Sequence, residues 1–193
     1  MVENKIMNAH EKLDTVIERI RHTFQAKGLG DIFDILEIWL VDDHEYVASI
    51  RGKRIEIKTY IAWILREGGI AFLIGHETYH FIKNLEKQHP NMWQESLDLI
   101  DKSKLSGFSK IISSIVLTAV AFPVNRFISR SEEHEADQFG KAIVVESGYN
   151  LSDVDHLFSI YEMRNSQGGG FLDTHPEYND RKRRLGLSIL TYI

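Results

Sequence analysis

Residues 70–87 read IAFLIGHETYHFIKNLEK and contain HETYH at residues 76–80, an H-E-x-x-H motif inside a run that is typical of a helix. Side chains four residues apart lie one turn above each other on a helix, so His76 and His80 can offer two imidazole nitrogens to one metal ion. Glu77 lies beside them, close enough to take a proton from a water molecule that the metal activates. The apolar run just upstream indicates that the helix passes through the core and holds these residues rigidly. The alternative is two surface histidines that are four apart by chance.

The composition of the 193 residues is that of a globular protein, with 43% hydrophobic and 26% charged residues. This length fits one domain over residues 1–193 with a sizeable buried core. The net charge of -5 argues against a nucleic-acid partner, and the basic run Arg181–Arg184 is typical of a solvated helix face. The absence of cysteine excludes disulfides, zinc ribbons and thiol nucleophiles. The N-terminal residues MVENKIMNAHEKL include no apolar signal region, so we expect a cytoplasmic protein without a signal peptide.

The periodicity of apolar residues predicts a mostly helical α+β fold with one small mixed sheet. Helices are expected, in chain order, over residues 4–27, 60–66, 70–87, 91–104, 132–147, 152–164 and 176–189. Strands are expected over residues 37–41, 46–51 and 54–58, the last two as a hairpin around Gly52-Lys53. Gly28 is expected to end the first helix and Gly68-Gly69 the second, and Ser152 is expected as an N-cap.

Ile111–Val124 is the most apolar stretch of the chain. It is shorter than the roughly 20 apolar residues that a membrane-spanning helix requires, so a buried helix is the first interpretation. A segment that contacts a membrane surface and a spanning helix are the alternatives. Association with a membrane through this stretch therefore stays open, as does the oligomeric state.

A third metal ligand is needed, because a catalytic zinc site takes three protein ligands and keeps one position open. The best candidates lie in residues 129–137, SRSEEHEAD, where spacing alone does not choose among three glutamates and a histidine. Glu133 and Asp137 share a helix face with the small Ala136, which would allow close approach to the H-E-x-x-H helix. Asp137 could then accept a hydrogen bond from a ligating histidine. The residues expected to face outward are Glu132, His134 and Glu135. The alternative is that all these charges form a solvated surface.

Three separated motifs resemble the zinc endopeptidases of the HtpX heat-shock protease and type I CAAX prenyl protease group, including its minimal members, the minigluzincins. They are the H-E-x-x-H motif, then Ser129-Arg130-x-x-Glu133-x-x-Ala136-Asp137, then Thr174-His175-Pro176 followed by Arg181 and Leu185. Their order and spacing match the family over about residues 46–185. Residues 1–45, an N-terminal helix and its lead-in, lie outside the resemblance. The larger family members carry transmembrane helices, so membrane or prenylated substrates are not implied for this chain.

The resemblance implies a gluzincin-like metallopeptidase with one zinc ion per chain. Its ligands would be His76, His80 and Glu133, and Asp137 would be the hydrogen-bonding companion of the site. The expected activity is that of a zinc metalloendopeptidase, which hydrolyses internal peptide bonds of a protein or peptide substrate with Glu77 as general base.

The resemblance also implies two further catalytic residues and a substrate-binding strand. His175 and Arg181 resemble the family residues that stabilise the oxyanion of the tetrahedral intermediate. Either Tyr46–Arg51 or Arg54–Lys58 resembles the exposed edge strand against which an extended peptide pairs.

Two alternatives to this function remain. An ImmA-like repressor-cleaving protease also pairs H-E-x-x-H with a downstream glutamate, although the motif around His175 argues against it. A zinc-binding but latent or inactive scaffold is the second, since the Gly168–Gly170 loop or the tail Ser188–Ile193 could cover the cleft.

Overall fold

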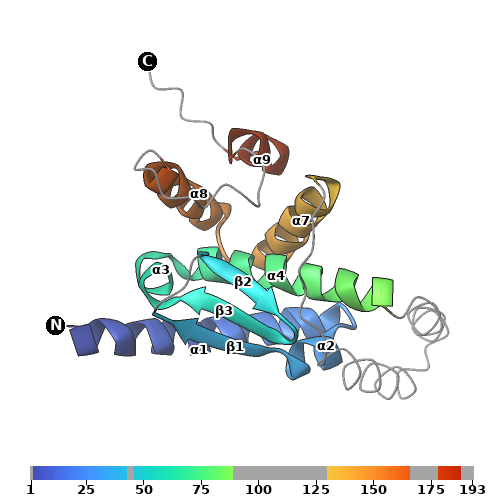
Figure 1. The fold of residues 1–193 in the computed structure, drawn as a ribbon, viewed down its shortest axis with the longest axis horizontal. Helices are drawn as coiled ribbons and strands as arrows, with labels where there is room; N and C mark the ends of the chain where they lie inside the picture. Colours follow the sequence, from blue (N-terminus) through green and yellow to red (C-terminus); the bar gives the residue numbers. More distant parts are fainter. Residues whose placement is uncertain (1, 43–45, 89–129, 166–177, 188–193) are drawn as a thin grey trace.

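The computed structural model describes residues 2–42, 46–88, 130–165 and 178–187. In chain order the elements are α1 (Val2–Ala26), α2 (Gly30–Ile35), β1 (Glu37–Val41), β2 (Ala48–Arg51), β3 (Arg54–Lys58), α3 (Thr59–Ile64), α4 (Glu67–Gln88), α7 (Arg130–Glu146), α8 (Leu151–Asn165) and α9 (Tyr178–Leu185). Figure 1 shows their arrangement, and the prediction of a mostly helical α+β fold with one small mixed sheet is confirmed.

Several segments singled out in the sequence lie outside the described residues. They are the expected helix at residues 91–104, the apolar stretch Ile111–Val124, the loop at residues 167–170 with His175 beyond it, and the tail Ser188–Ile193. Within the ranges that the structure describes, no helix is long and apolar enough to cross a membrane.

The sheet has the strand order β1-β3-β2, with β1 parallel and β2 antiparallel to the central strand β3. Ile55 and Ile57 on β3 are completely buried, as their alternation with polar residues predicts. Two strands were candidates for the edge strand. The assignment to Arg54–Lys58 is wrong, because this strand is hydrogen-bonded to a neighbouring strand on both sides. Ala48–Arg51 lies at an edge of the sheet and so has one side without a neighbouring strand.

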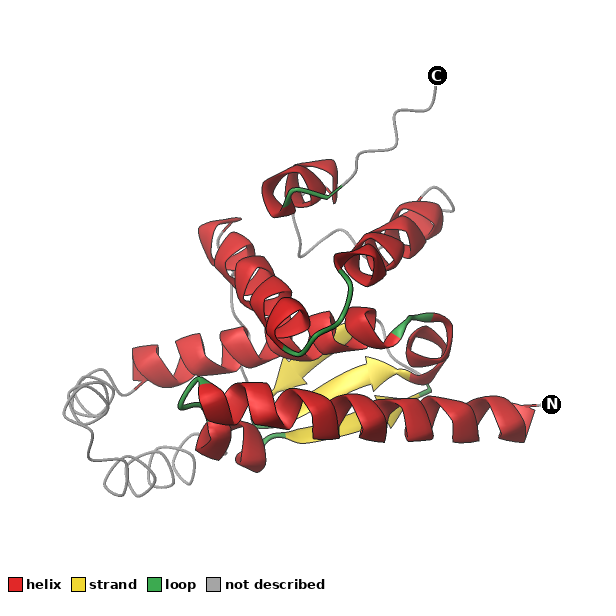
Figure 2. Ribbon diagram, turned by 180° about the vertical axis from the view of Figure 1, so that it is seen from behind, coloured by secondary structure: helices red, strands yellow, loops and turns green. Residues whose placement is uncertain are grey.

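Helix α1 supplies one wall of the core with a stripe of apolar side chains. Leu13, Ile20 and Phe24 are buried as their spacing predicts, and Val16 between them is buried as well. The helix ends as expected at Gly28, whose φ of 71° suits glycine, and the amide of the next residue donates to the carbonyl of Phe24. Seen from behind, α1 runs in front of the strands (Figure 2).

Helix α4 is the central element, because α1, α7, α8 and both strands of the hairpin contact it. The expectation that Gly68-Gly69 closes the preceding helix is wrong, since both glycines lie in the first turn of α4 and are buried. A Cβ on Gly68 would lie 2.6 Å from a carboxylate oxygen of Asp153 on α8. These glycines therefore allow two helices to approach closely, and they do not mark a turn.

A second pair of glycines brings α4 and α7 together beside the motif. A Cβ on Gly75 would lie 3.0 Å from the Cα of Gly140, and a Cβ on Gly140 would lie 2.8 Å from the carbonyl oxygen of Phe72. From the sequence, the close approach is expected at Ala136, which is also completely buried. The glycine contact lies one turn later than Ala136, at Gly140.

Gly140→Ala is expected to destabilise the protein by up to about 2 kcal/mol. Overpacking costs about 1–3 kcal/mol, and alanine offsets roughly 1 kcal/mol of this because it favours a helix more than glycine does. Urea denaturation measures the change, with Val145→Ala on the exposed side of α7 as control, expected within about 0.5 kcal/mol. An unchanged or raised stability of Gly140→Ala would show that α7 can move away from α4 without loss.

The start of α8 and the end of α9 differ from the sequence predictions. Helix α8 begins at Leu151, and the side chain of Asn150 caps it by accepting a hydrogen bond from the amide of Ser152 at 2.9 Å. Ser152 is therefore not the N-cap. Helix α9 ends at Leu185 and not at residue 189, because Gly186 with φ 69° reverses the chain.

The basic run on α9 is not a solvated face throughout. Arg181 and Lys182 are only 6% and 2% exposed, and Lys182 forms an ion pair with Asp155 of α8 at 2.9 Å. Arg183 and Arg184 are exposed, as expected for this run. The fold tolerates the burial of these two cations because each forms an ion pair with a carboxylate of another helix.

Candidate metal centre

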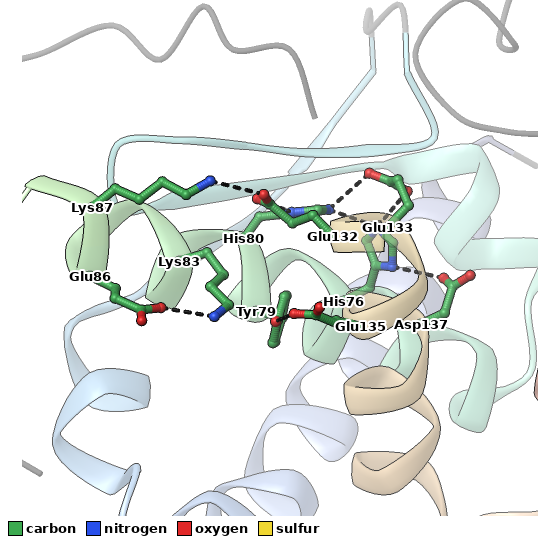
Figure 3. Close-up of polar contacts among 10 residues, drawn as sticks. All are labelled: His76, Tyr79, His80, Lys83, Glu86, Lys87, Glu132, Glu133, Glu135 and Asp137. Carbon is green, nitrogen blue, oxygen red and sulfur yellow. Dashed lines mark hydrogen bonds and ion pairs between the residues drawn. The ribbon is translucent and has the colours of Figure 1, made fainter. Parts of the chain in front are cut away.

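The two histidines of the motif lie one turn apart on α4 and point the same way (Figure 3). Each is only 3% exposed, and their Nε2 atoms are 3.1 Å apart. The rings meet edge to face, with centroids separated by 4.8 Å. A rigid helix that crosses the core thus holds two imidazole nitrogens at one buried point, as the sequence predicts for His76 and His80.

Glu133 on α7 completes a group of three convergent side chains. Its carboxylate oxygens lie 3.2 Å from Nε2 of His80 and 3.6 Å from Nε2 of His76, and the side chain is 1% exposed. Among the described residues, these three form the group of histidine and acidic side chains whose ligand atoms lie within 4.8 Å of one another. Of the four candidates that spacing left open, Glu133 is the one that the structure groups with the two histidines.

The spacing of these three donors fits a zinc ion. Ligand atoms at about 2.0–2.1 Å from a tetrahedral zinc lie about 3.3 Å from one another. The distances of 3.1, 3.2 and 3.6 Å between the converging atoms bracket that value. Two imidazole nitrogens and one carboxylate, all buried, are also the donor types that zinc takes in catalytic sites.

Negative charge gathers around the two histidines. Burial by itself would lower the pKa of His80, yet the carboxylates of Glu133 and Glu77 raise it overall. Glu77 is 6% exposed and follows His76 on the same helix. A buried site with this charge favours a cation.

The expected hydrogen bond between Asp137 and a histidine is present, joining Oδ1 of Asp137 to Nδ1 of His76 at 3.0 Å. Arg181 of α9 binds the same carboxylate in a bidentate manner, with Nε 2.8 Å from Oδ2 and Nη2 2.5 Å from Oδ1. Burial would raise the pKa of Asp137, but the Arg181 guanidinium and the hydrogen bond with His76 lower it to about 2. Asp137 is thus an ionised acceptor that orients the ring of His76.

Glu132 corrects one expectation from the sequence. It is not turned outward but 7% exposed, with Oε1 3.7 Å from Nδ1 of His80 and Oε2 3.0 Å from Nζ of Lys87. Figure 3 shows it directed toward the end of α4. Glu135 is exposed as expected and hydrogen-bonds Tyr79, and His134 is partly exposed. The rotation of α7 against α4 decides which of these side chains face inward, and the spacing of the acidic residues does not predict that rotation.

A pocket opens beside the converging atoms. Glu77, His76 and Arg181 line it, together with Ala48, Phe72, Leu73 and Tyr161. Phe72 and Leu73 precede His76 by one turn, so helical spacing could have identified them. Ala48 belongs to one of the two strands that the motif resemblance offered as the substrate-binding edge strand. Nothing in the sequence marked Tyr161 of α8, which only the tertiary structure brings to the site.

The comparisons with known proteins give one family. The chain matches the family model described as peptidase family M48 over residues 10–187. This match begins inside α1, so it includes most of the N-terminal segment that the motif resemblance left out. No curated protein and no solved structure was found to match the chain.

Proposed function

We propose, from the premise that the chain belongs to peptidase family M48 and is therefore a metallopeptidase, that it is a zinc-dependent endopeptidase. Its substrates would be proteins or peptides cleaved at internal peptide bonds, as in the gluzincins and their minimal members. One observation carries the proposal: His76, His80 and Glu133 converge at a buried point, and Glu77 faces the adjoining pocket.

His76, His80 and Glu133 would hold the zinc ion, one per chain. Both histidines would bind through Nε2, since these are the atoms that approach each other and Glu133. When bound, zinc would polarise the peptide carbonyl and lower the pKa of a water molecule from about 15.7 toward about 7. Side chains of the protein would carry out the proton transfer and contribute to stabilising the oxyanion.

Glu77 is proposed as the general base. It follows the first histidine on α4 and lines the pocket, so its carboxylate can take the proton of the attacking water and deliver it to the leaving amine. Its burial keeps bulk water from competing for that proton.

His175 and Arg181 are proposed, by resemblance, to stabilise the oxyanion. Arg181 lines the same pocket as Glu77, which supports its part of the proposal. It also holds Asp137, and through it the ring of His76. His175 lies outside the described residues.

The substrate is proposed to pair with the edge strand β2 in the extended conformation. Ala48 at its start lines the pocket that contains Glu77, so a peptide added along β2 would bring its backbone toward the catalytic residues. The family match favours this endopeptidase over an ImmA-like enzyme.

Metal content and hydrolysis of labelled casein test the proposal together. We expect about one zinc per chain in the purified protein, loss of zinc in Glu133→Ala, and retention of zinc in Glu135→Ala, a carboxylate on the exposed side of the same helix. Casein hydrolysis should stop on chelation and return with zinc. A protein without zinc would contradict the metal site, and a zinc-loaded protein that hydrolyses nothing would favour the latent scaffold.

A further inference from the structure

We infer that Glu132 is a positioning residue: it orients His80 for zinc binding, as Asp137 orients His76. The inference rests on the proposed zinc site. It gives helix α7 three separate carboxylates at that site: one ligand, Glu133, and one companion for each ligand histidine.

Each histidine has one ring nitrogen, Nδ1, outside the converging group. Because Nε2 of both rings points to the converging group, each Nδ1 points away from it. Ligand histidines almost always donate this second N–H to a carboxylate, carbonyl or water, which fixes the tautomer and the ring orientation. His76 meets this requirement through Asp137. Nδ1 of His80 is buried and has no hydrogen-bond partner among the described residues.

Glu132 is the group that faces this nitrogen. Its Oε1 lies 3.7 Å from Nδ1 of His80, and its side chain is only 8% exposed. The separation is longer than a hydrogen bond of about 2.7–3.2 Å. The terminal torsion of a glutamate is broad and soft, so a small rotation of the carboxylate can close the gap without moving α7.

Lys87 holds the other oxygen of this carboxylate. Its ammonium group, in the last turn of α4, lies 3.0 Å from Oε2 of Glu132. The arrangement parallels that of the other histidine, where Arg181 holds Asp137. In both cases a cation on another helix holds one oxygen of a buried carboxylate while the carboxylate faces Nδ1 of a histidine. Such a partner fixes the orientation of the imidazole and makes it a better metal ligand.

The test is the zinc affinity of the apoprotein, measured by competition with a chromophoric chelator. Loss of such a companion costs about 10–100-fold in metal affinity, so Glu132→Ala is expected to raise the zinc Kd by that factor. Glu132→Gln keeps the shape and removes the charge, and it is expected near the lower end of the same range. Glu135→Ala removes a carboxylate from the exposed side of α7 and should leave the Kd unchanged.

The visible spectrum of the Co²⁺-substituted protein provides a readout that general destabilisation does not move. A reoriented His80 should shift the d–d bands in both Glu132 variants and not in Glu135→Ala. Wild-type Kd and spectrum in a folded Glu132→Gln would overturn the inference while leaving the zinc site intact. Complete loss of zinc in that variant would also overturn it, by making Glu132 a ligand. A wild-type protein that binds no zinc would instead remove the proposed function itself.

Discussion

Glu77→Gln is expected to lower kcat/KM for casein hydrolysis by about 10²–10⁴-fold, the contribution typical of general acid–base catalysis. Glutamine has nearly the same shape as glutamate and cannot accept the proton of the attacking water. Glu77 is not one of the three converging donors, so the zinc content should stay at that of the wild type. Hydrolysis of labelled casein and zinc analysis of the same preparation check both halves of this expectation.

Glu86→Gln is the matched control. It makes the same change on the same helix, at a partly exposed side chain that pairs with Lys83. Full activity is expected for this variant. If Glu77→Gln retained wild-type activity at full zinc occupancy, another group would have to serve as the base.

Arg181→Met is expected to destabilise the protein by about 3–5 kcal/mol, because it leaves the carboxylate of Asp137 buried without its cation. Asp137 is 1% exposed and Arg181 6%, so water does not replace the lost partner. A loss of this size is a large part of the roughly 5–15 kcal/mol of a typical domain. Chemical denaturation at neutral pH measures it, and Arg184→Met, which removes an exposed arginine of the same helix, should change stability by less than about 0.5 kcal/mol.

The same pair predicts how stability depends on pH. The pKa of Asp137 is lowered in the folded protein to about 2, against an unfolded value of about 3.9. Its contribution is therefore present above pH 4 and is lost as the pH falls from about 4 to 2. In Arg181→Met the unpaired carboxylate takes up a proton more readily, so the difference between variant and wild type should shrink with falling pH. A difference that is constant with pH would show that Asp137 is not the group affected.

The local sequence determined the elements that carry the site. The H-E-x-x-H run forms one buried helix because a continuous apolar run precedes the motif, and the helix is buried on all sides from Gly68 to Thr78. The hairpin around Gly52-Lys53 forms because alternating residues flank a turn, and Gly52 has the φ of 60° that such a turn requires. Spacing of four residues was enough to bring the nitrogens of His76 and His80 together, since it depends only on helix geometry.

The resemblance of the motifs added what spacing alone could not, the choice of Glu133 among its neighbours. The hydrogen bond from His76 to Asp137 followed from the same helix period, because residues four apart on α7 face α4 together. Residues on one helix keep their relation to each other wherever the helix packs.

Other features were decided by the tertiary structure alone. Whether Glu132 faces the solvent or His80 depends on how α7 is rotated against α4, and the glycine contact at Gly75 and Gly140 sets that packing. Strand order decided that β2 and not β3 is an edge, because β1 pairs in parallel with β3 on the side opposite β2. Burial of Arg181 likewise required a carboxylate on another helix. These outcomes depend on contacts between segments far apart in the chain, which no local pattern of residues contains.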